Sequence, residues 1–511
     1  MSERQLSFEE VRDRFFINPK NPDPEVVKSG IGHLVDSWLD GKTKNLLKDD
    51  LDELDAISLE IVSDYLGSGP YDGTAKGGAR RFDELSVAQV HPVDNIIGLF
   101  SHVASTLANN NTIISEDSPL ESEYETKAVK WMLEHIAGYD PEVASGALVS
   151  GGTSANITAL LVAREALQDS EFTADPWDGK SPIKILASVM THYSIDKTSR
   201  ILGPRGLIQV DSVPLIPGSY TMDPNALREM VIRSRSVGEK IMAIVAVAGE
   251  TETGLVDDLD SIAEIAQDNG IFLHFDGAYG APFVLSRQGH LLSALSESDS
   301  LACDPQKYLY AQYSVGSVMF ADSAHHELLG PLNDGGKHYM FKDDEARAKA
   351  QADLINISNP NINNLGHRRI EGSMGGQAAS TLYNTIKYIG KNGLKQLLDH
   401  TLDVTTAFSD EIGRQNSGLQ LSYEPVLNQV CIEPSLKAAN KDERVELVSR
   451  SLYDDLGIYL STTSLPVVDG QDKDARAEYR KVFRFVATHP HTSEEDARYI
   501  AEELSKLWTK I

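Results

Sequence analysis

The sequence predicts an α/β protein with a large, mostly parallel sheet and a smaller α+β domain at its C-terminal end. Two observations predict this class. From about residue 96, short apolar runs that end in Gly, Ser, Thr or Asp alternate with amphipathic helical segments. Such runs are typical of strands buried on both faces, and helical segments between them are typical of crossovers in a parallel sheet. After about residue 380 the pattern changes to one long helix followed by shorter mixed elements.

Five apolar runs are the predicted strands of the large sheet. They are GALVSGG (146–152), IKILASVMTHYS (183–194), IMAIVAVAGE (241–250), IFLHFDGA (271–278) and SVGSVMFAD (314–322). The long helix is predicted over 381–412. The chain is then expected to close with a strand, KVFRFVA (481–487), and a helix whose capping box pairs Thr492 with Glu495.

These changes in pattern divide the chain into three expected parts. They are an N-terminal helical segment (1–95), a large domain (96–380) and a small C-terminal domain (381–511). Within the first part, apolar residues have helical spacing from Pro24 to about Tyr65, and a glycine-rich loop runs from Gly67 to Gly78.

Charge and cysteine content argue against several classes of function. The chain has 47 Lys+Arg against 76 Asp+Glu, a formal net charge of −29, whereas nucleic acids and anionic membranes bind positive surfaces. Two cysteines, Cys303 and Cys431, are too few for a disulfide scaffold or a zinc module, and they favour a reducing compartment. The N-terminus lacks the apolar segment of a secretory signal, and no run of 18 apolar residues occurs, so we expect a cytoplasmic protein.

Four polar features follow predicted strands, at the edge where open α/β sheets bind their ligands. The first is the turn SGGTSAN (150–156), directly before a helix. Small residues there leave backbone N–H groups directed at an anion, which suits a phosphate. The second is His192, which follows the second predicted strand. Taken alone, the turn is equally compatible with holding no ligand, and a lone histidine after a strand is more often structural than functional.

The third and fourth features are an acid and a lysine. Asp276 ends an apolar strand, and an acid held there suits a cationic ring nitrogen, while the small Ala278 leaves room for a flat ring. Lys307 ends the segment Asp304-Pro-Gln-Lys, and a lysine whose pKa is lowered by partial desolvation forms Schiff bases. In isolation, Asp276 would cap a turn and Lys307 would lie on the surface.

Together the four features match the demands of pyridoxal 5′-phosphate. Its phosphate needs N–H donors, its ring a stacking partner, its protonated nitrogen a carboxylate and its aldehyde an amine. The sequence supplies these in order, with 31 residues from Asp276 to Lys307 and 25 from Thr251 to Asp276. We therefore expect pyridoxal phosphate as cofactor and no metal.

These stretches resemble the group II pyridoxal-phosphate-dependent amino-acid decarboxylases, from about residue 90 to about 390. The matching segments are SEDSPLESEYE (115–125), VSGGTSANITALLVARE (149–165), THYSIDKTSRILG (191–203), GETETGLVDDLDSI (249–262), HFDGAYGAPFV (274–284), DPQKYLYAQYSVGSVMF (304–320) and EGSMGGQAA (371–379). The resemblance implies the aspartate-aminotransferase-like fold (fold type I), with a seven-stranded sheet. It also implies decarboxylation of an L-amino acid to the amine and CO2, and a homodimer to whose interface the N-terminal segment contributes.

By position, the resemblance also assigns roles. Lys307 would carry the Schiff base, Asp276 would bind the ring nitrogen, and Ala278 and His192 would lie on opposite ring faces. Thr251 would lie near the ring substituents.

The phosphate would be held by Gly151, Gly152 and Thr153, with help from Asp304 and from Gln306. The family usually has His where this chain has Gln306, and a glutamine can donate a hydrogen bond but cannot act as an acid or base.

Two further positions concern the reaction. Tyr339, in the glycine-rich segment 330–344, is the candidate to protonate the substrate Cα, with His338 next; the alternative is an ordinary loop aromatic. Met374 stands where several relatives carry Arg or Lys.

The substrate is left open. The segment after Lys307 resembles microbial tyrosine decarboxylases in Tyr310, Tyr313 and Gly316, which favours an aromatic amino acid. Arg368 and Arg369 would suit glutamate or aspartate, or would hold the substrate carboxylate, or are structural. The polar segment 109–119 is expected to line the pocket, in this subunit or its neighbour.

Two other functions are retained. One is C–C bond cleavage of the kind catalysed by sphingosine-phosphate lyases, which have a similar glycine turn and Asp–Lys pair. The other is a catalytically silent cofactor-binding dimer, which Gln306 favours. Release of CO2 would distinguish them from a decarboxylase.

Overall fold

The computed structural model describes residues 6–16, 28–29, 31–33, 84–329 apart from 94, 114 and 116, and then 365–435, 440–467 and 479–511. The predicted helical stretch 24–65 lies almost entirely outside these residues. The glycine-rich loop 67–78 and Tyr339 lie wholly outside them.

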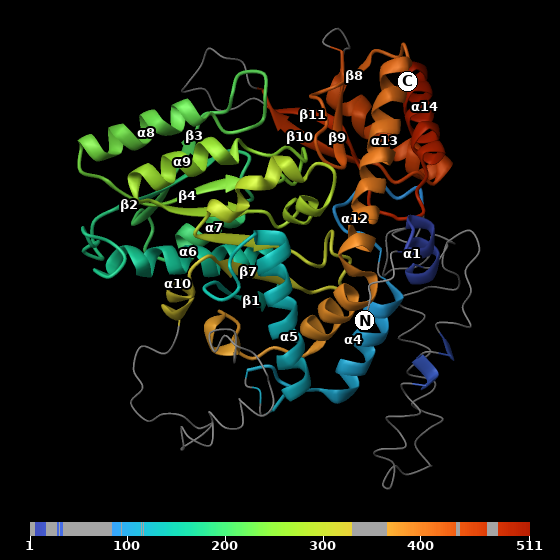
Figure 1. Ribbon diagram of the computed structural model, residues 1–511. Helices are drawn as coiled ribbons and strands as arrows, with labels where there is room; N and C mark the ends of the chain where they lie inside the picture. The colour runs from blue at the N-terminus through green and yellow to red at the C-terminus, as the bar shows by residue number, and fades with distance from the viewer. Residues whose placement is uncertain are drawn as a thin grey trace, which may run out of the picture.

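A seven-stranded sheet forms the centre of the described chain, in the order β1-β7-β6-β5-β4-β2-β3 (Figure 1). Its strands are β1 (Ser145–Val149), β2 (Ile183–Ser188), β3 (Ile208–Val213), β4 (Lys240–Val247), β5 (Phe272–Asp276), β6 (Ser300–Cys303) and β7 (Gly316–Phe320). Strands β3, β2, β4, β5 and β6 pair in parallel, and β7 runs antiparallel to β1 and β6. The predicted fold class is confirmed.

Each of the five predicted apolar runs overlaps a strand, and β1 and β4 begin one residue earlier than predicted, but β3 and β6 were not predicted. Strand β3 lies at the sheet edge and is partly exposed, and it includes Gln209 and Asp211, so it shows no apolar run. Strand β6 is fully buried but only four residues long.

Helices cover both faces of this sheet. One face carries α6 (Gly152–Gln168) and α7 (Ser194–Ile201); the other carries α8 (Pro224–Ser236), α9 (Leu259–Asn269) and the short helices η3 (Ala281–Leu285) and η4 (Gly289–Glu297). The side chains of β2 show why both faces are covered. In β2, Ile183 and Ile185 pack with α6 and α7, whereas Leu186 packs with α8 and α9. Because successive side chains of a strand point to opposite faces, an apolar strand requires both helical layers.

A second, antiparallel sheet has the order β10-β11-β9-β8. Its strands are β8 (Leu419–Leu421), β9 (Gln429–Pro434), β10 (Ser461–Pro466) and β11 (Tyr479–Val486), covered by α13 (Lys441–Leu456) and α14 (Glu494–Lys510). The predicted closing strand and helix are β11 and α14. The predicted cap of α14 is wrong: Ser493, not Thr492, accepts from the N–H of Asp496 and forms the capping box. The hydroxyl of Thr492 instead donates to the carbonyl of Glu84.

Helix α12 (Gln377–Arg414) connects the two sheets and contains the predicted long helix (Figure 1). It is interrupted at Gly390, whose φ of 71° lies in the left-handed region that favours glycine. Helices α1 (Phe8–Phe15), α4 (Ile96–Ala108) and α5 (Pro119–Met132) pack against it. The remaining short helices are η2 (Leu133–Ala137), α10 (Ser323–Glu327) and η6 (Leu365–Arg368). Within the described residues, no helix is both long and apolar enough to span a membrane.

Candidate active site

A cavity of about 300 Å³ lies at the carboxyl ends of β4, β5 and β6. It is lined by all ten residues predicted to bind the cofactor, which are Gly151, Gly152, Thr153, His192, Thr251, Asp276, Ala278, Asp304, Gln306 and Lys307. Ser150, Ser154, Asn156, Tyr193 and Tyr313 complete the lining. The fold therefore brings together predicted residues as far apart as Gly151 and Lys307, at the edge where open α/β sheets bind ligands.

The glycine turn leaves open space at the N-terminus of α6. Gly151 precedes the helix with a φ of 153°, and Gly152 is its first residue. A Cβ atom on Gly152 would lie 3.0 Å from the Cβ of Ala278 and 3.1 Å from Oδ2 of Asp304. A side chain there would occupy part of the cavity, so glycine keeps the first backbone N–H groups of a 17-residue helix accessible to an anion.

Lys307 and Asp304 form a buried ion pair beside this turn. Nζ of Lys307 lies 3.2 Å from Oδ2 of Asp304, and the side chains are 14% and 4% exposed. Burial lowers the pKa of Lys307, but the carboxylates of Asp304 and Asp276 outweigh it, so its pKa lies above the ordinary value. The condition considered from the sequence, a net lowering of this pKa by partial desolvation, is therefore not met. Burial raises the pKa of Asp304, and its Oδ1 has no hydrogen-bond partner in the described chain.

Asp276 ends β5 and is 5% exposed. Its Oδ2 accepts a hydrogen bond from the side-chain amide of Asn156 (2.8 Å), and its Oδ1 accepts one from the backbone N–H of Ala278 (3.2 Å). Both donors are neutral, so the negative charge is retained and further lone pairs remain available for a cationic N–H.

His192 lies partly buried on the cavity wall, and burial lowers the pKa of its imidazole. Its Nδ1 lies 2.8 Å from Oγ of Ser194, at the start of α7. A neutral, fixed imidazole is suited to lie against a flat ring.

Gln306 is buried, and its amide is held in one orientation. Its Oε1 accepts from the backbone N–H of Val315 over 2.6 Å. The amide nitrogen consequently points toward the glycine turn, 3.6 Å from the position that a Cβ of Gly151 would take. A donor at this place suits a phosphate oxygen.

Of the three residues that suggest an aromatic substrate, one lines the cavity. Tyr313 does, and its ring packs on His91 with centroids 4.4 Å apart. Tyr310 is 1% exposed and lies in the core against Phe16. Gly316 faces the backbone of Gly151 so closely that no side chain fits between them.

Arg368 and Arg369 do not line the cavity of the described chain. Arg369 is 6% exposed and pairs with Glu125 (3.0 Å) while also donating to the carbonyl of Thr112. Arg368 lies 3.7 Å from Glu327. Arg369 is thus a structural tie between distant segments, one of the alternatives considered from the sequence.

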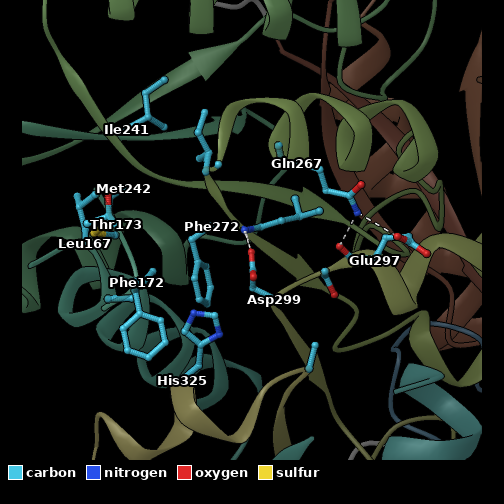
Figure 2. Close-up of a pocket in the computed structure, with 18 of the residues that line it drawn as sticks. Leu167, Phe172, Thr173, Ile241, Met242, Gln267, Phe272, Glu297, Asp299 and His325 are labelled. Carbon is cyan, nitrogen blue, oxygen red and sulfur yellow. Dashed lines mark hydrogen bonds between the residues drawn. The ribbon is translucent and has the colours of Figure 1, made fainter. Parts of the chain in front are cut away.

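A second cavity, of about 580 Å³, lies at the opposite ends of β4 and β5 (Figure 2). Its wall includes Phe172, Phe272 and His325, with the rings of Phe172 and His325 stacked, and the carboxylate of Asp299, which accepts from the N–H of Leu273. Of the predicted site residues that the structure describes, none lines this second cavity. Nor do three or more His, Cys, Asp or Glu side chains gather as a metal site requires anywhere in the part of the chain that the structure describes.

Sequence reasoning missed the residues that support the cavity wall. Asn156 donates to Asp276, Ser194 bonds to His192, and His274 bonds to Asn156. Glu371 anchors Ser150 through its Oε1, 2.8 Å from the backbone N–H. All four lie inside the motifs that were recognised. Nothing in the sequence shows which of their neighbours they contact.

Comparisons with known proteins identify the family. Residues 81–434 match the family described as "Pyridoxal-dependent decarboxylase conserved domain". The chain belongs to this family. Its cofactor is pyridoxal phosphate.

Several relatives are named amino-acid decarboxylases. The chain is 26% identical to aromatic-L-amino-acid decarboxylase of Bacillus atrophaeus over 400 residues, which are 76% of this chain and 73% of that protein. It is 28% identical to aspartate 1-decarboxylase of Aliivibrio fischeri over 380 residues, 68% of this chain and 64% of that protein. The chain thus spans less than two thirds of the length of the second relative.

Solved structures share the fold. Tryptophan decarboxylase of Catharanthus roseus, in complex with L-tryptophan, matches with a TM-score of 0.71 at 17% identity, covering 99% of this chain and 100% of that one. The glutamate decarboxylase domain of a Vibrio parahaemolyticus L-2,4-diaminobutyrate decarboxylase matches with a TM-score of 0.69 at 21% identity, covering 98% and 99%.

The residues present fit the cofactor. The open space at Gly152 lies beside the N-terminus of α6, where the first backbone N–H groups of the helix would act as donors to a phosphate. Asp276 and Lys307 line the same cavity, available to a ring nitrogen and an aldehyde. When bound, pyridoxal phosphate supplies an electron sink for the pair of electrons left when a bond to the substrate Cα breaks.

Proposed function

We propose that this chain decarboxylates an L-amino acid, with tyrosine or another aromatic amino acid the best candidate, to the amine and CO2. The observation that carries the proposal is the gathering of Lys307, Asp276, His192 and the glycine turn around one cavity of suitable size. The named decarboxylases among the relatives support it.

In this proposal each side chain has one task. Lys307 binds the cofactor covalently through its amine and is displaced when the substrate amine arrives. Asp276 keeps the ring nitrogen protonated, because its two hydrogen-bond donors are neutral and leave its charge uncancelled. His192 packs on the ring, with Ala278 on the opposite face and Thr251 near the ring substituents.

The phosphate is assigned to the turn of Gly151, Gly152 and Thr153, where backbone N–H groups at the start of α6 act as donors. Gln306 adds its amide N–H. Asp304 is assigned here by its position in the motif; burial raises the pKa of its carboxyl, which donates to a phosphate oxygen only in the protonated form. The protonation of the substrate Cα stays assigned to Tyr339, outside the described residues.

Charge in the cavity favours an aromatic substrate over an acidic one. Among the described residues that line it, Lys307 is the sole Lys or Arg, whereas Asp276 and Asp304 are both acids. An acidic side chain would therefore lack a counter-charge within the described part of one subunit. Tyr313, whose ring packs on His91, instead offers an aromatic side chain in the cavity lining. The alternative, glutamate or aspartate, draws support from the relatives named as aspartate and acidic amino acid decarboxylases.

A homodimer is part of the proposal, with α4 at its interface. This helix leaves Ile97, Phe100 and Val103 only half buried, next to a groove of about 380 Å³ that Leu120 and Tyr388 also line. An apolar helix face of this kind is typical of a protein interface. The free, buried thiols of Cys303 and Cys431 support a reducing, cytoplasmic location.

The test is a panel of L-amino acids scored for CO2 and amine. We expect CO2 and amine in equal amounts from one aromatic amino acid, and much less from glutamate or aspartate. Preferred release from an acidic amino acid would favour the alternative substrate. A reaction that cleaves a phosphorylated long-chain substrate without CO2 would favour the C–C lyase. Cofactor binding without turnover of any amino acid would favour the silent dimer.

A further inference from the structure

Asn156 lines the cavity and lies at the centre of a buried hydrogen-bond network. It is in the second turn of α6 and is 1% exposed. Its Nδ2 donates to Oδ2 of Asp276 (2.8 Å) and to Oγ of Ser194 (2.9 Å). Its Oδ1 lies 2.9 Å from Nε2 of His274.

The partners fix the orientation of this amide. A carboxylate only accepts, so the Asn156 atom that faces Asp276 is the nitrogen, and the atom that faces His274 is the oxygen. The amide oxygen also only accepts, so His274 carries its proton on Nε2. Its Nδ1 then accepts from the hydroxyl of Ser300 over 2.8 Å. Burial lowers the pKa of His274 to about 4, which keeps this imidazole neutral.

The same amide reaches His192 through one hydroxyl. Ser194 accepts from Asn156, so its own proton is free to go to Nδ1 of His192, 2.8 Å away. The His192 imidazole then carries its proton on Nε2. One side chain is thus connected directly to the carboxylate at the ring nitrogen and, through Ser194, to the imidazole on the ring face.

We propose that Asn156 is a positioning residue that holds Asp276 and His192 at fixed places relative to each other, without cancelling the charge of the carboxylate. This inference rests on the proposed assignment of Asp276 and His192 to the cofactor ring. An arginine or lysine at position 156 would orient the carboxylate equally but would neutralise it. An acid would repel it. The amide provides donors and no net charge.

The experiment compares Asn156→Asp with a matched control. Aspartate is nearly the same size and still accepts from His274, but when ionised it cannot donate to Asp276 or Ser194. The control is Thr158→Val, on the same helix and 0% exposed; among the described residues its hydroxyl bonds to the carbonyl of Ser154 alone. Each apoprotein is titrated with pyridoxal phosphate, and the visible absorption and circular dichroism of the bound cofactor, Tm, kcat and KM are measured.

We expect Asn156→Asp to weaken cofactor binding by about tenfold or more, since a hydrogen bond to a charged group is being lost, and to change the cofactor's circular dichroism. Its kcat should fall with little change in KM. Thr158→Val should lower Tm alone. If the aspartate variant does not fold, Asn156→Ala replaces it. We expect this variant also to bind the cofactor more weakly and to have a lower kcat.

A normal dissociation constant and spectrum in Asn156→Asp would overturn the inference, as would a change confined to Tm. Asp276→Ala distinguishes that result from failure of the proposed site. If Asp276→Ala is defective while Asn156→Asp is normal, only the inference fails. If Asp276→Ala is also normal, the assignment of the ring nitrogen partner fails.

Discussion

Nζ of Lys307 lies 3.2 Å from Oδ2 of Asp304, and this ion pair is almost fully buried. The pair affects cofactor capture, which is the reaction of the Lys307 amine with the aldehyde of pyridoxal phosphate. Only a neutral amine attacks an aldehyde, but Asp304, with Asp276, holds the pKa of Lys307 above its ordinary value. The lysine must lose a proton that its neighbours stabilise, so capture should be slow at neutral pH and faster at high pH.

Asp304→Asn should therefore move the pH profile of capture to lower values. Removing a carboxylate in direct contact lowers a lysine pKa by about one unit or more, so the midpoint should fall by about that amount. Formation of the visible chromophore from apoprotein and pyridoxal phosphate, followed between pH 6 and pH 10, measures it. Asp299→Asn, a substitution of a carboxylate in the other cavity, is the control and should leave the midpoint in place. An unchanged or higher midpoint in Asp304→Asn would contradict the electrostatic account.

Asp276→Ala should reduce kcat by roughly a hundredfold or more while Tm stays close to that of the wild type. Without the carboxylate the ring nitrogen loses its proton, and each 1.4 kcal/mol of lost stabilisation costs about tenfold in rate. Steady-state release of CO2 measures the effect. A loss smaller than about tenfold would mean that Asp276 only caps the turn that follows β5.

Glu250→Gln should weaken the pH dependence of stability. Burial raises the pKa of Glu250 to about 7, from 4.5 in the unfolded chain, so the folded state holds a proton that the unfolded state releases. The contribution of Glu250 to the free energy of unfolding is fully present below about pH 4.5. It is lost as the pH rises through 7, and the total loss is on the order of 3 kcal/mol. The glutamine variant should therefore lose less stability than the wild type between pH 5.5 and pH 8.

Urea midpoints at these two pH values measure the difference. Burial also raises the pKa of Asp257, to about 6, so Asp257 likewise makes the protein less stable as the pH rises. Glu250→Gln should therefore reduce the pH dependence of stability without abolishing it. An equal loss of stability in the wild type and in Glu250→Gln would show that Glu250 is ionised in the fold.

Phe100→Glu should dissociate the proposed dimer. A charge on the apolar face of α4 would be buried against the second copy. The free energy needed to desolvate an unpaired carboxylate there would exceed the free energy that an interface of ordinary size supplies. Sedimentation velocity measures the mass. Ile232→Glu, at an apolar side chain on α8 that is 62% exposed, is the control and should leave the mass unchanged. A dimer that persists in Phe100→Glu would place the interface elsewhere.

The sequence predicted the site best where the chemical role of a residue follows from its type and its place after a strand. Lys307, Asp276 and the glycine turn stand in an ordered series whose chemistry points to a single cofactor, and the fold brings them together. Strand β3 escaped prediction because a half-exposed edge strand needs no apolar run. The cap of α14 was displaced by one residue because Thr492 finds a partner in Glu84, far away in the chain.

Contacts across elements were not predictable either. From the sequence, Arg369 is equally compatible with a substrate ligand and with a structural residue. Its ion pair with Glu125 in the structure decides for the structural role. The same is true of Asn156, whose role depends on three partners from α7 and β5. The raised pKa of Lys307 has the same origin, because it results from carboxylates whose approach only the fold determines.

The most direct test of the account is reduction of the protein with borohydride in the presence of pyridoxal phosphate, followed by mass spectrometry of its peptides. We predict one pyridoxyl group per chain, on Lys307, and loss of the visible chromophore in Lys307→Ala. A label on another lysine, or an unchanged chromophore in Lys307→Ala, would contradict the assignment of this cavity as the active site.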